Sequence, residues 1–561
     1  MSDLCVFDIE SYNFNEVYAI GMYNGKEYTS HIAKPIKNRI RNNNIFIKFL
    51  LDNLENNSKT YAHYGGSFDF LFILDYVNSC NDSEIVSIKL INSKIGKLII
   101  RYENKILEFL DSSLILPASL YNLTKDFDVV HKKLKLDYDL GLEDSRLAEY
   151  LRNDCMGLYE VLEASKLTDR LTIASNSMNT FLNNFYNRRF DLKVSNNSDT
   201  QDSIFREGYI GGRVELYKKY GISLNYYDVN SLYPYVMRNN KYPLISKNNF
   251  TVVNDIRRKD IGIYYCKIKT TDISIPILPY KDTKNKRVIY PQGTFEGWYY
   301  SPELHLAISR GYDVEVIKGY VFNECDYIFE DYVNYYYKIK SESTGSKKQI
   351  AKLFLNSLYG KFGQKREFEY FRPLKEIKNN VPFITIGNLP FERGMNYSGY
   401  SGYLHSEISG FVCSYARAYM YSLFEKCGLD NVYYSDTDSI ITSTLMETDS
   451  KKLGALKNED SIKEFIGISP KLYAYITNDN KVVIKSKGLD VKKLKYEDFS
   501  AHMKSDKYPL FTKSLKISGI KTSILKKSDN LTNTYILKRQ KRNNDNKRIS
   551  TDSINTKPIV I

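Results

Sequence analysis

Two apolar runs flank a pair of acidic residues near position 437, and this pattern constrains the fold more than any other part of the chain. Residues 432–435 precede Asp436, Thr437 and Asp438, and residues 439–441 follow them. Strand side chains alternate between faces, so the two aspartates can project the same way if the segment is extended. A turn here would instead make it a hairpin tip. A divalent cation would relieve the repulsion between the carboxylates, although an isolated motif of this kind is more often a solvated turn.

The chain is long and basic, which limits its class and its partners. Its 561 residues are too many for one hydrophobic core, so several domains are expected. A formal net charge of +14 and a pI of about 9.0 indicate a polyanionic partner, most simply nucleic acid. A generic basic surface is the alternative explanation.

The cysteines and the apolar segments exclude several protein classes. The seven Cys residues have no paired CxxC spacing, so neither a zinc site nor a disulfide framework is indicated, and a reducing compartment fits best. No apolar run reaches 18 residues, and the N-terminus resembles neither a signal peptide nor a presequence. No membrane partner is expected, and host cytoplasm and mitochondrion both remain open as the compartment.

Acidic residues recur at three points in the first 170 residues. Asp8 and Glu10 lie two apart near the end of an apolar strand, where an unpaired acid is costly unless it binds a metal. Asp69 directly precedes an apolar run. Tyr150 and Asp154 are i, i+4 neighbours in a helical pattern.

These three segments resemble the three exonuclease motifs of proofreading DNA polymerases. The resemblance implies an RNase H-like domain in which Tyr150 orients the attacking water and four acids bind two metal ions. The four acids are Asp8, Glu10, Asp69 and Asp154. In-line hydrolysis of a phosphodiester uses one metal to activate water and another to stabilise the leaving oxygen. An α/β domain with incidental acids is the alternative.

Two further segments bear on binding of a single-stranded end. Tyr64 stands where this family usually has an Asn that contacts the 3′ end, so that contact is in doubt. Ser119 and Leu120 resemble the family's element that binds the frayed strand; an ordinary helix start is the alternative.

A glycine-rich element follows the helix-rich connector at 170–200. Tyr209, Gly211 and Gly212 resemble the Tyr-x-Gly-Gly element that joins exonuclease and polymerase domains and holds the template strand. Glycine permits close backbone approach to a ligand, although a plain turn explains the segment equally well.

Asp228 ends a strand-like run and begins a segment that resembles motif A of family B DNA polymerases, Asp-x2-Ser-Leu-Tyr-Pro. The resemblance implies that Asp228 binds both metals and that Val229 contributes its backbone carbonyl. Tyr233 would stack beneath the incoming sugar and exclude a 2′-hydroxyl, so it would select deoxynucleotides.

Residues 348–360 have helical periodicity and carry a basic stripe formed by Lys348, Lys352, Asn356 and Tyr359. Such stripes are usually solvated, but a triphosphate lying along the helix would also explain this one. The segment resembles motif B, which implies that Lys352 grips the triphosphate while Asn356 and Tyr359 shape the nucleotide pocket. Lys340 lies where relatives carry a second phosphate-binding lysine.

The opening acidic pair resembles motif C. Asp438 and Asp436 would join Asp228 in holding two Mg²⁺ ions, which Mn²⁺ can replace. Lys471 and Tyr473 resemble the Lys-x-Tyr element that holds the primer terminus; a strand with a surface lysine is the alternative.

Motif order and compactness resemble the protein-primed branch of family B DNA polymerases. We therefore expect a mixed α/β and α+β chain, with an exonuclease domain at 1–170 and a right-hand polymerase domain of palm, fingers and thumb at 171–561. Two insertions are placed near 240–330 and 380–405. The resemblance implies a monomer that acts on DNA primer–template and dNTPs. Because no domain is seen ahead of Asp8, a terminal protein is expected either as a separate chain or as a part missing from this one.

Two other functions were weighed. A nuclease or DNA-binding protein with a vestigial polymerase half is the main alternative, although all the polymerase acids and lysines are present. A structural capsid or adaptor role has no support beyond the charge. The basic stretches at 538–542 and 547–548 suit either a thumb that touches duplex phosphates or a disordered tail.

Overall fold

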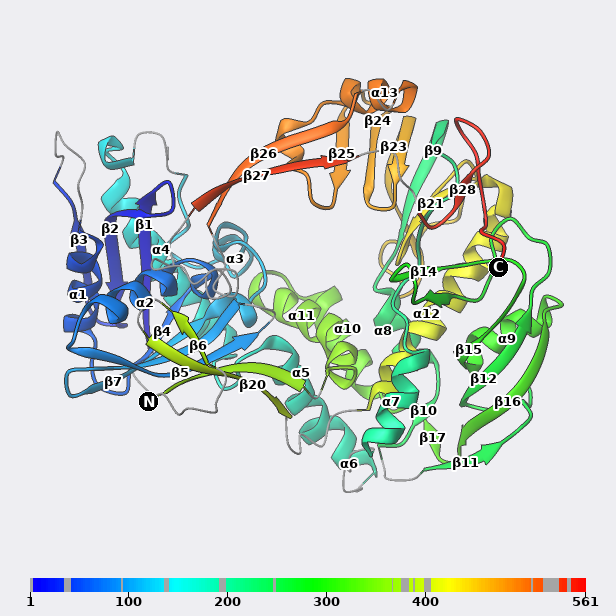
Figure 1. The fold of residues 1–561 in the computed structure, drawn as a ribbon, viewed down its shortest axis with the longest axis horizontal. Helices are drawn as coiled ribbons and strands as arrows, with labels where there is room; N and C mark the ends of the chain where they lie inside the picture. Colours follow the sequence, from blue (N-terminus) through cyan, green and yellow to red (C-terminus); the bar gives the residue numbers. More distant parts are fainter. Residues whose placement is uncertain are drawn as a thin grey trace.

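The fold is taken from a computed structural model that describes residues 4–34, 42–91, 94–135, 141–190, 198–245, 249–365, 367–374, 383–386, 389–397, 405–505, 508–517, 534–541 and 546–561. Figure 1 shows an N-terminal sheet on one side and a second large sheet on the other, with a helical pair between them. Among the described helices, none is both long enough and apolar enough to cross a membrane.

The N-terminal sheet has its parallel strands at the centre, where β1 pairs with β4 and β4 pairs with β7. Most of β1 is buried, which explains its nearly continuous apolar sequence. The strands supplied by the N-terminal segment are β1 (Leu4–Tyr12), β2 (Glu16–Tyr23), β3 (Tyr28–Ile32), β4 (Lys59–Ala62), β5 (Ser83–Ile91), β6 (Lys94–Tyr102) and β7 (Lys105–Asp111).

Helices cover this sheet and bring acidic residues to its central strand. The helix α4 packs on β1 and β2, while α1 packs on β2 and α2. Ser119 caps α3 by accepting a hydrogen bond from the backbone N–H of Asn122. These helices are α1 (Asn43–Asn53), α2 (Asp69–Ser79), α3 (Leu120–Asp126) and α4 (Leu147–Ser165).

Three later strands extend the N-terminal sheet across the predicted division at 170/171. The strand β18 (Glu367–Pro373) pairs with β5, and β20 (Leu389–Tyr397) and β19 (Phe383–Ile386) follow in that order. The insertion expected at 380–405 therefore belongs to a ribbon that begins earlier, at 367. Its remaining parts lie outside the described residues.

The second large sheet is antiparallel and runs in the order β25-β24-β23-β9-β22-β21-β8. Its strands are β8 (Val214–Leu216), β9 (Tyr220–Val229), β21 (Val432–Asp436), β22 (Ser439–Thr442), β23 (Leu456–Ser469), β24 (Leu472–Thr477) and β25 (Val482–Ser486). Asp436 pairs with Ser439, so Thr437 and Asp438 form a two-residue hairpin loop. The hairpin interpretation of the acidic segment is thus the one that the structure shows.

Helices link and support the two halves of the chain. The helix α7 begins with a capping box between Ser198 and Gln201. The adjacent helices α10 and α11 lie between the two large sheets in Figure 1. The helices of this part are α5 (Ile173–Phe181), α6 (Asn187–Phe190), α7 (Asp199–Gly208), α8 (Leu232–Asn239), α10 (Glu330–Glu342), α11 (Gly345–Phe362) and α12 (Ser406–Cys427).

A smaller sheet occupies the region expected to hold an insertion at 240–330. It consists of β11 (Phe250–Val253), β16 (Asp313–Phe322), β12 (Gly262–Lys269) and β15 (Thr294–Tyr300), in that spatial order. The helix α9 (Ser301–Ser309) follows β15 and packs on α12. Two short pairs accompany it: β10 (Tyr242–Pro243) with β17 (Cys325–Asp326), and β13 (Tyr280–Asp282) with β14 (Arg287–Ile289).

The C-terminal part begins with α13 (Tyr496–Lys504) and continues as a long two-stranded ribbon of β26 (Leu510–Ile517) and β27 (Thr534–Lys541). Figure 1 shows the ribbon reaching from the second sheet toward the N-terminal one, and Ile517 packs on the N-terminal core. The pair β28 (Ile549–Ser550) and β29 (Thr556–Lys557) then lies beside β8 and β9, where Lys219 donates to the carbonyl of Ile554 at 2.7 Å.

Candidate active sites

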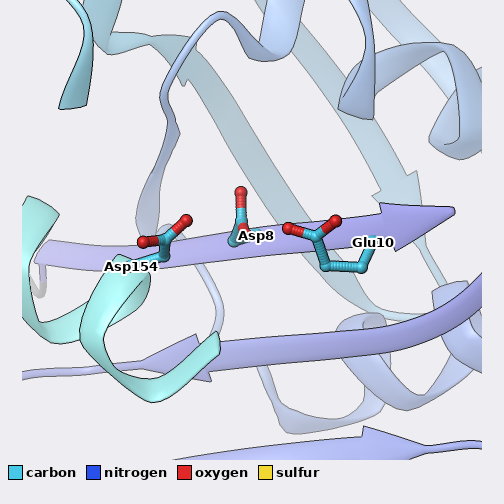
Figure 2. Close-up of side chains that lie close together, drawn as sticks. All are labelled: Asp8, Glu10 and Asp154. Atoms are coloured by element: carbon cyan, nitrogen blue, oxygen red, sulfur yellow. The ribbon is translucent and has the colours of Figure 1, made fainter. Parts of the chain in front are cut away.

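The first site joins a strand and a helix of the N-terminal half. Asp8 and Glu10 project from β1, and Asp154 projects toward them from α4 (Figure 2). One carboxylate oxygen from each lies within 4.8 Å of the others. The sequence expectation that these three acids converge therefore agrees with their placement.

Burial makes this cluster electrostatically costly. The pKa of Asp8 is raised to about 7, chiefly by burial and secondly by the negative charge of Asp154, while Lys133 opposes the shift. Burial also raises the pKa of Glu10 well above its usual value, with the charge of Asp8 adding to the effect. The positive charge of Lys133 thus offsets only part of the cost of burying these carboxylates.

Asp69 begins α2 and is buried, and the charge of Asp8 contributes to raising its pKa. Asp8 Oδ2, Asp69 Oδ1 and Asp154 Oδ1 are buried without a hydrogen-bond partner among the described residues. Buried polar atoms normally find partners, and carboxylate oxygens are the ligands that Mg²⁺ prefers. The residues present therefore fit the divalent metal ions that the sequence predicts.

Lys133 is a site residue that sequence reasoning missed. Its ammonium pairs with Asp154, donates to the hydroxyl of Tyr150 at 2.6 Å and lies 4.4 Å from the centre of that ring. The predicted orienting residue Tyr150 is thus held beside the acids. Lys133 belongs to a His-Lys-Lys run with no distinctive spacing, so only its folded position reveals it.

The two segments expected to contact single-stranded nucleic acid, at Tyr64 and at residues 119–120, differ in exposure. The Tyr64 ring is 40% exposed, its backbone has a φ of 64°, and the ammonium of Lys94 lies 5.3 Å from the ring centre. Ser119 uses its hydroxyl to cap α3, and Leu120 is buried. The alternative of an ordinary helix start accounts for what these two residues do here.

The second site lies where β9 and β22 pair in the antiparallel sheet. Asp228 is the partner of Ser439, and the backbone N–H of Val229 donates to the carbonyl of Asp438 at 2.8 Å. The pKa of Asp228 is raised to about 7, chiefly by burial and then by the charges of Asp438 and Glu459. The two aspartates, 210 positions apart, thus meet as the sequence predicts, and their mutual repulsion fits a shared divalent cation.

Asp436 has a different partner from the one expected. Lys471 donates to both of its carboxylate oxygens, at 2.7 and 2.6 Å. The hairpin turn at Thr437, which has a φ of 63°, lies between the two acids. Burial raises the pKa of Asp438, and the charge of Asp436 adds to that shift while Lys471 opposes it. Asp436 is thus paired with Lys471 in this structure, and its assignment as a metal ligand stays a prediction.

The two residues of the predicted primer element also take structural positions. Lys471 is engaged by Asp436, and Tyr473 is 5% exposed and stacks on Tyr475 at an interplanar angle of 15°. The Lys471 side chain is 41% exposed, and the contact of these two residues with the primer terminus stays a prediction.

Three lysines converge opposite Asp228. Burial lowers the pKa of Lys340, and the charges of Lys352 and Lys348 lower it further, while Asp228 opposes the shift. The Lys340 ammonium donates to the hydroxyl of Ser231 at 2.7 Å. On α11 Lys348 and Lys352 are exposed, whereas Ala351, Phe354, Leu355 and Leu358 are buried. The stripe predicted for this helix therefore faces the site.

Two aromatic rings close one side of this site. Tyr233 from α8 and Tyr359 from α11 stack with a centroid separation of 4.3 Å and an interplanar angle of 24°. Asn356, one turn before Tyr359, is exposed. The rings come from the two segments that were expected to shape a nucleotide pocket.

The glycine-rich element lies against the acidic hairpin. A Cβ on Gly212 would approach the side chain of Thr437 to 2.6 Å, and the backbone N–H of Thr437 donates to the carbonyl of Arg213 at 2.8 Å. A Cβ on Gly211 would meet no atom within 4 Å. Tyr209 is mostly enclosed, and burial raises its pKa to about 12. Close approach thus explains Gly212, whereas Gly211 borders open space.

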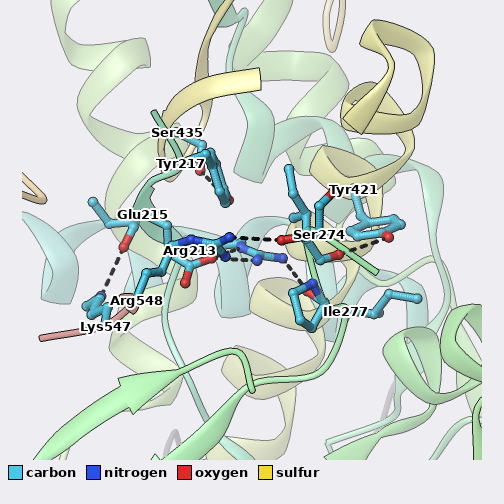
Figure 3. A network of polar contacts seen from close by, with 12 residues as sticks. Arg213, Glu215, Tyr217, Ser274, Ile277, Tyr421, Ser435, Lys547 and Arg548 are labelled. Carbon is cyan, nitrogen blue, oxygen red and sulfur yellow. Dashed lines mark hydrogen bonds and ion pairs between the residues drawn. The ribbon is translucent and has the colours of Figure 1, made fainter. Parts of the chain in front are cut away.

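Buried charges fix the neighbourhood of this element, as Figure 3 shows around Arg213. Arg213 pairs with Glu215 and donates to the carbonyl of Pro276 at 2.6 Å. Arg548 donates to the carbonyl of Ser274 at 2.9 Å, and Lys547 donates to that of Val214 at 3.0 Å. Both basic tail residues therefore pack on the protein, so a disordered tail does not describe them, while duplex contact stays a prediction.

Comparison with known proteins agrees with this architecture. The chain matches the family model for DNA polymerase type B, organellar and viral, over residues 52–150 and 142–380. A protein named "Probable DNA polymerase" from Podospora anserina is 32% identical over 498 residues, which cover 70% of this chain and 41% of that protein. The DNA-directed DNA polymerase of Enterobacteria phage PRD1 is 26% identical over 524 residues, which cover 86% of this chain and 85% of the phage protein.

The chain spans about half the length of the fungal relatives that it matches. A solved structure of Phi29 DNA polymerase, complexed with primer-template DNA and incoming nucleotide substrates, matches 97% of this chain and 100% of that chain. Its TM-score is 0.76 and its identity is 21%, which confirms the expected fold of an exonuclease domain with palm, fingers and thumb. Because the family model covers more than half of the sequence, this chain belongs to the type B DNA polymerases of the organellar and viral kind.

Proposed function

We propose that the chain is a DNA-directed DNA polymerase that replicates a linear viral or plasmid genome by protein priming and proofreads with a 3′–5′ exonuclease. One observation carries the proposal. Asp228 on β9 lies beside Asp438 in the hairpin loop that precedes β22, and lysines from α10 and α11 act on the same site. Negative charge that would hold metal ions thus faces positive charge that would hold a triphosphate.

The relatives support this choice of substrate. The Phi29 structure holds primer-template DNA and incoming nucleotides, and we propose the same partners here. The ribbon β26–β27 suits a duplex, since it carries five basic residues and no acid; they are Lys513, Lys516, Lys538, Arg539 and Lys541. A terminal protein that provides the priming hydroxyl, and a monomeric polymerase, complete the proposal.

For synthesis, Asp228, Asp438 and the carbonyl of Val229 would hold the metal ions. When bound, two Mg²⁺ ions, or Mn²⁺ in their place, would lower the pKa of the primer 3′-hydroxyl and stabilise the leaving pyrophosphate. Lys352 and Lys340 neutralise the triphosphate from opposite helices.

Lys348 extends the positive stripe on α11, and Asn356 lies on the same face. Tyr233 supports the sugar of the incoming nucleotide. Its ring is stacked on Tyr359 and cannot turn away without losing that contact, so it leaves no room for a 2′-hydroxyl.

For proofreading, the buried acids of the N-terminal site would hold the second pair of ions. Tyr150 would orient the water, and Lys133 would stabilise the negative charge that develops on the scissile phosphate. The acids are Asp8, Glu10, Asp69 and Asp154.

The two reactions belong to separable regions. We propose residues 1–170 as the exonuclease domain and 171–561 as the polymerase domain, with the ribbon β18–β20 shared at their border. Residues 240–330 and the ribbon from 367 onward are proposed as the two insertions that contact the terminal protein and encircle DNA.

A primer-extension assay with Mg²⁺ and dNTPs tests the polymerase. Asp438→Ala should abolish extension and spare degradation of a single strand, while Asp8→Ala with Glu10→Ala should do the reverse. Loss of both activities in both folded variants would show that the sites are not separate. Failure of the wild-type chain to extend any primer would favour a nuclease with a vestigial polymerase half.

Priming is tested with a candidate terminal protein and one labelled dNTP. Protein priming predicts a covalent nucleotide on that protein, which survives denaturation and requires Asp438. Extension from oligonucleotides alone, without labelling of any candidate, would reject the protein-primed part of the proposal.

A further inference from the structure

We propose that Glu303, acting through Arg417, is a positioning residue for the connecting loop, residues 209–212, and thereby sets the affinity for primer–template DNA. The inference rests on the proposed function and on the template contact that the resemblance of Tyr209, Gly211 and Gly212 to the Tyr-x-Gly-Gly element implies. Glu303 lies on α9, in the smaller sheet region, and Arg417 lies on α12.

Arg417 divides its hydrogen bonds between an acid and the loop. Its Nε and one terminal nitrogen donate to Glu303 Oε1 and Oε2, at 2.8 and 2.5 Å. The other terminal nitrogen donates to the carbonyls of Ile210 and Gly211, the latter at 2.8 Å. The planar guanidinium therefore links the orientation of Glu303 to the position of two loop carbonyls.

Both charged side chains are buried, with exposures of 4% for Arg417 and 2% for Glu303. A buried ion pair contributes little net stability, because desolvation offsets the attraction. Its main consequence here is geometric. The connecting loop has no regular backbone pairing, so its carbonyls, including that of the buried Ile210, need donors from elsewhere. Arg417 supplies them, and Glu303 holds Arg417 in the one orientation that reaches both.

The rest of the connecting loop either contacts the hairpin at Thr437 or borders open space. Thr437 donates its backbone N–H to Arg213, directly after the loop, and packs on Gly212. A Cβ on Gly211 would meet nothing within 4 Å. Arg417 thus holds the loop from its inner side, and the hairpin that carries Asp438 packs against it. The outer face of the loop at Gly211 is open to a nucleic-acid strand.

The same two elements offer a matched control. Arg310, directly after α9, pairs with Glu425 on α12 at 2.5 and 2.9 Å. This pair is partly exposed, and its hydrogen bonds join the end of α9 to α12 rather than to the connecting loop. Glu425→Gln therefore removes one acid from the same junction without affecting the loop carbonyls.

The experiment compares Glu303→Gln, Glu425→Gln and the wild-type full-length chain. Affinity for a labelled primer–template is measured by fluorescence anisotropy without metal or dNTP, beside thermal melting. We expect Kd to rise at least tenfold in Glu303→Gln and less than twofold in Glu425→Gln. At saturating DNA, kcat for nucleotide insertion should stay within threefold of wild type, and so should degradation of a single strand.

A second substitution guards against simple misfolding. Arg417→Lys keeps the charge but cannot reach the acid and both carbonyls at once, so it should weaken DNA binding as Glu303→Gln does, whereas Glu303→Asp should restore part of the affinity. Unchanged Kd in Glu303→Gln, a rise equal to that of Glu425→Gln, or a parallel loss of all activities with melting temperature would each overturn the inference. A wild-type chain that neither binds nor extends primer–template would instead refute the proposed function.

Discussion

Lys133 shows how a single residue gains its importance from the fold. Its ammonium pairs with Asp154 and lies over Tyr150. We expect Lys133→Ala to lower the exonuclease rate about 10²- to 10³-fold, because it removes one preorganised charge from the site, and to leave primer extension unchanged. Single-strand degradation measures the effect. Lys132→Ala is the control, since Lys132 bonds to Asp128 at the surface; equal losses in the two variants would contradict the assignment.

His63 gives the N-terminal half a defined dependence on pH. Its ring nitrogens lie 2.9 Å from Ser112 Oγ and 2.7 Å from the carbonyl of Ala118, and burial lowers the pKa of His63 to about 4. Between pH 6.5 and 4 the unfolded chain binds a proton here that the folded chain does not. The contribution of His63 is therefore complete above pH 6.5 and is lost as the pH falls, by about 3 kcal/mol at 1.36 kcal/mol per pKa unit.

Comparison of the wild type with His63→Gln isolates the pH-dependent contribution of His63 to stability, because glutamine cannot titrate. Buried acids such as Asp8 shift stability in the opposite direction over the same range, so only the difference between wild type and variant is informative. Urea unfolding at pH 7 and at pH 4.5 should show the wild type losing more stability than the variant. A difference that does not change with pH would show that His63 is not held neutral.

The helix α11 buries its apolar face and turns its basic face toward the proposed nucleotide site. Lys352 acts on the same site as Lys340, whereas Lys347 is exposed and makes no such contribution. Lys352→Gln should raise KM for dNTP about 10- to 100-fold, the cost of one lost charge-assisted hydrogen bond. Steady-state insertion of one nucleotide measures it. Lys347→Gln should change KM less than twofold, and a similar rise there would assign the effect to general charge.

The predicted elements that the structure confirms are those with a strong local sequence pattern. The apolar run around Asp8 is a buried strand, and residues 348–360 lie within a helix whose apolar side is buried. The hairpin at Thr437 also follows from its sequence. Pairing partners did not follow: β18 joins β5 across nearly 280 positions, and no periodicity in either strand specifies that contact.

At the scale of the whole molecule, the segment 546–561 packs against parts of the chain that are distant in sequence, near Tyr217 and Ser274. Arg548 is buried, donates to Thr556 Oγ1 at 2.9 Å and to the carbonyl of Ser274 at 2.9 Å, and lies 5.0 Å from the ring of Tyr217. Arg548→Ala leaves those acceptors unpaired and should lower the free energy of unfolding by about 2–4 kcal/mol.

Thermal melting with a domain-specific readout tests this role. The lowered transition should be that of the polymerase half, with the exonuclease on single strands preserved at temperatures below it. Lys557→Ala, on the exposed side of β29, should have an effect within about 0.5 kcal/mol of wild type. A stable Arg548→Ala protein would mean that the docked tail contributes little to the fold.

The amino-acid sequence by itself determined the chemical inventory: the order of the acidic motifs, the basic helix and the aromatic residues that mark a type B polymerase. These depend on residue type and short spacing, which local backbone geometry preserves. The tertiary structure alone decided that Asp436 pairs with Lys471, that Lys133 enters the acidic cluster and that Arg417 supports the connecting loop. Each is a long-range contact set by chain packing, and packing is a property of the whole fold.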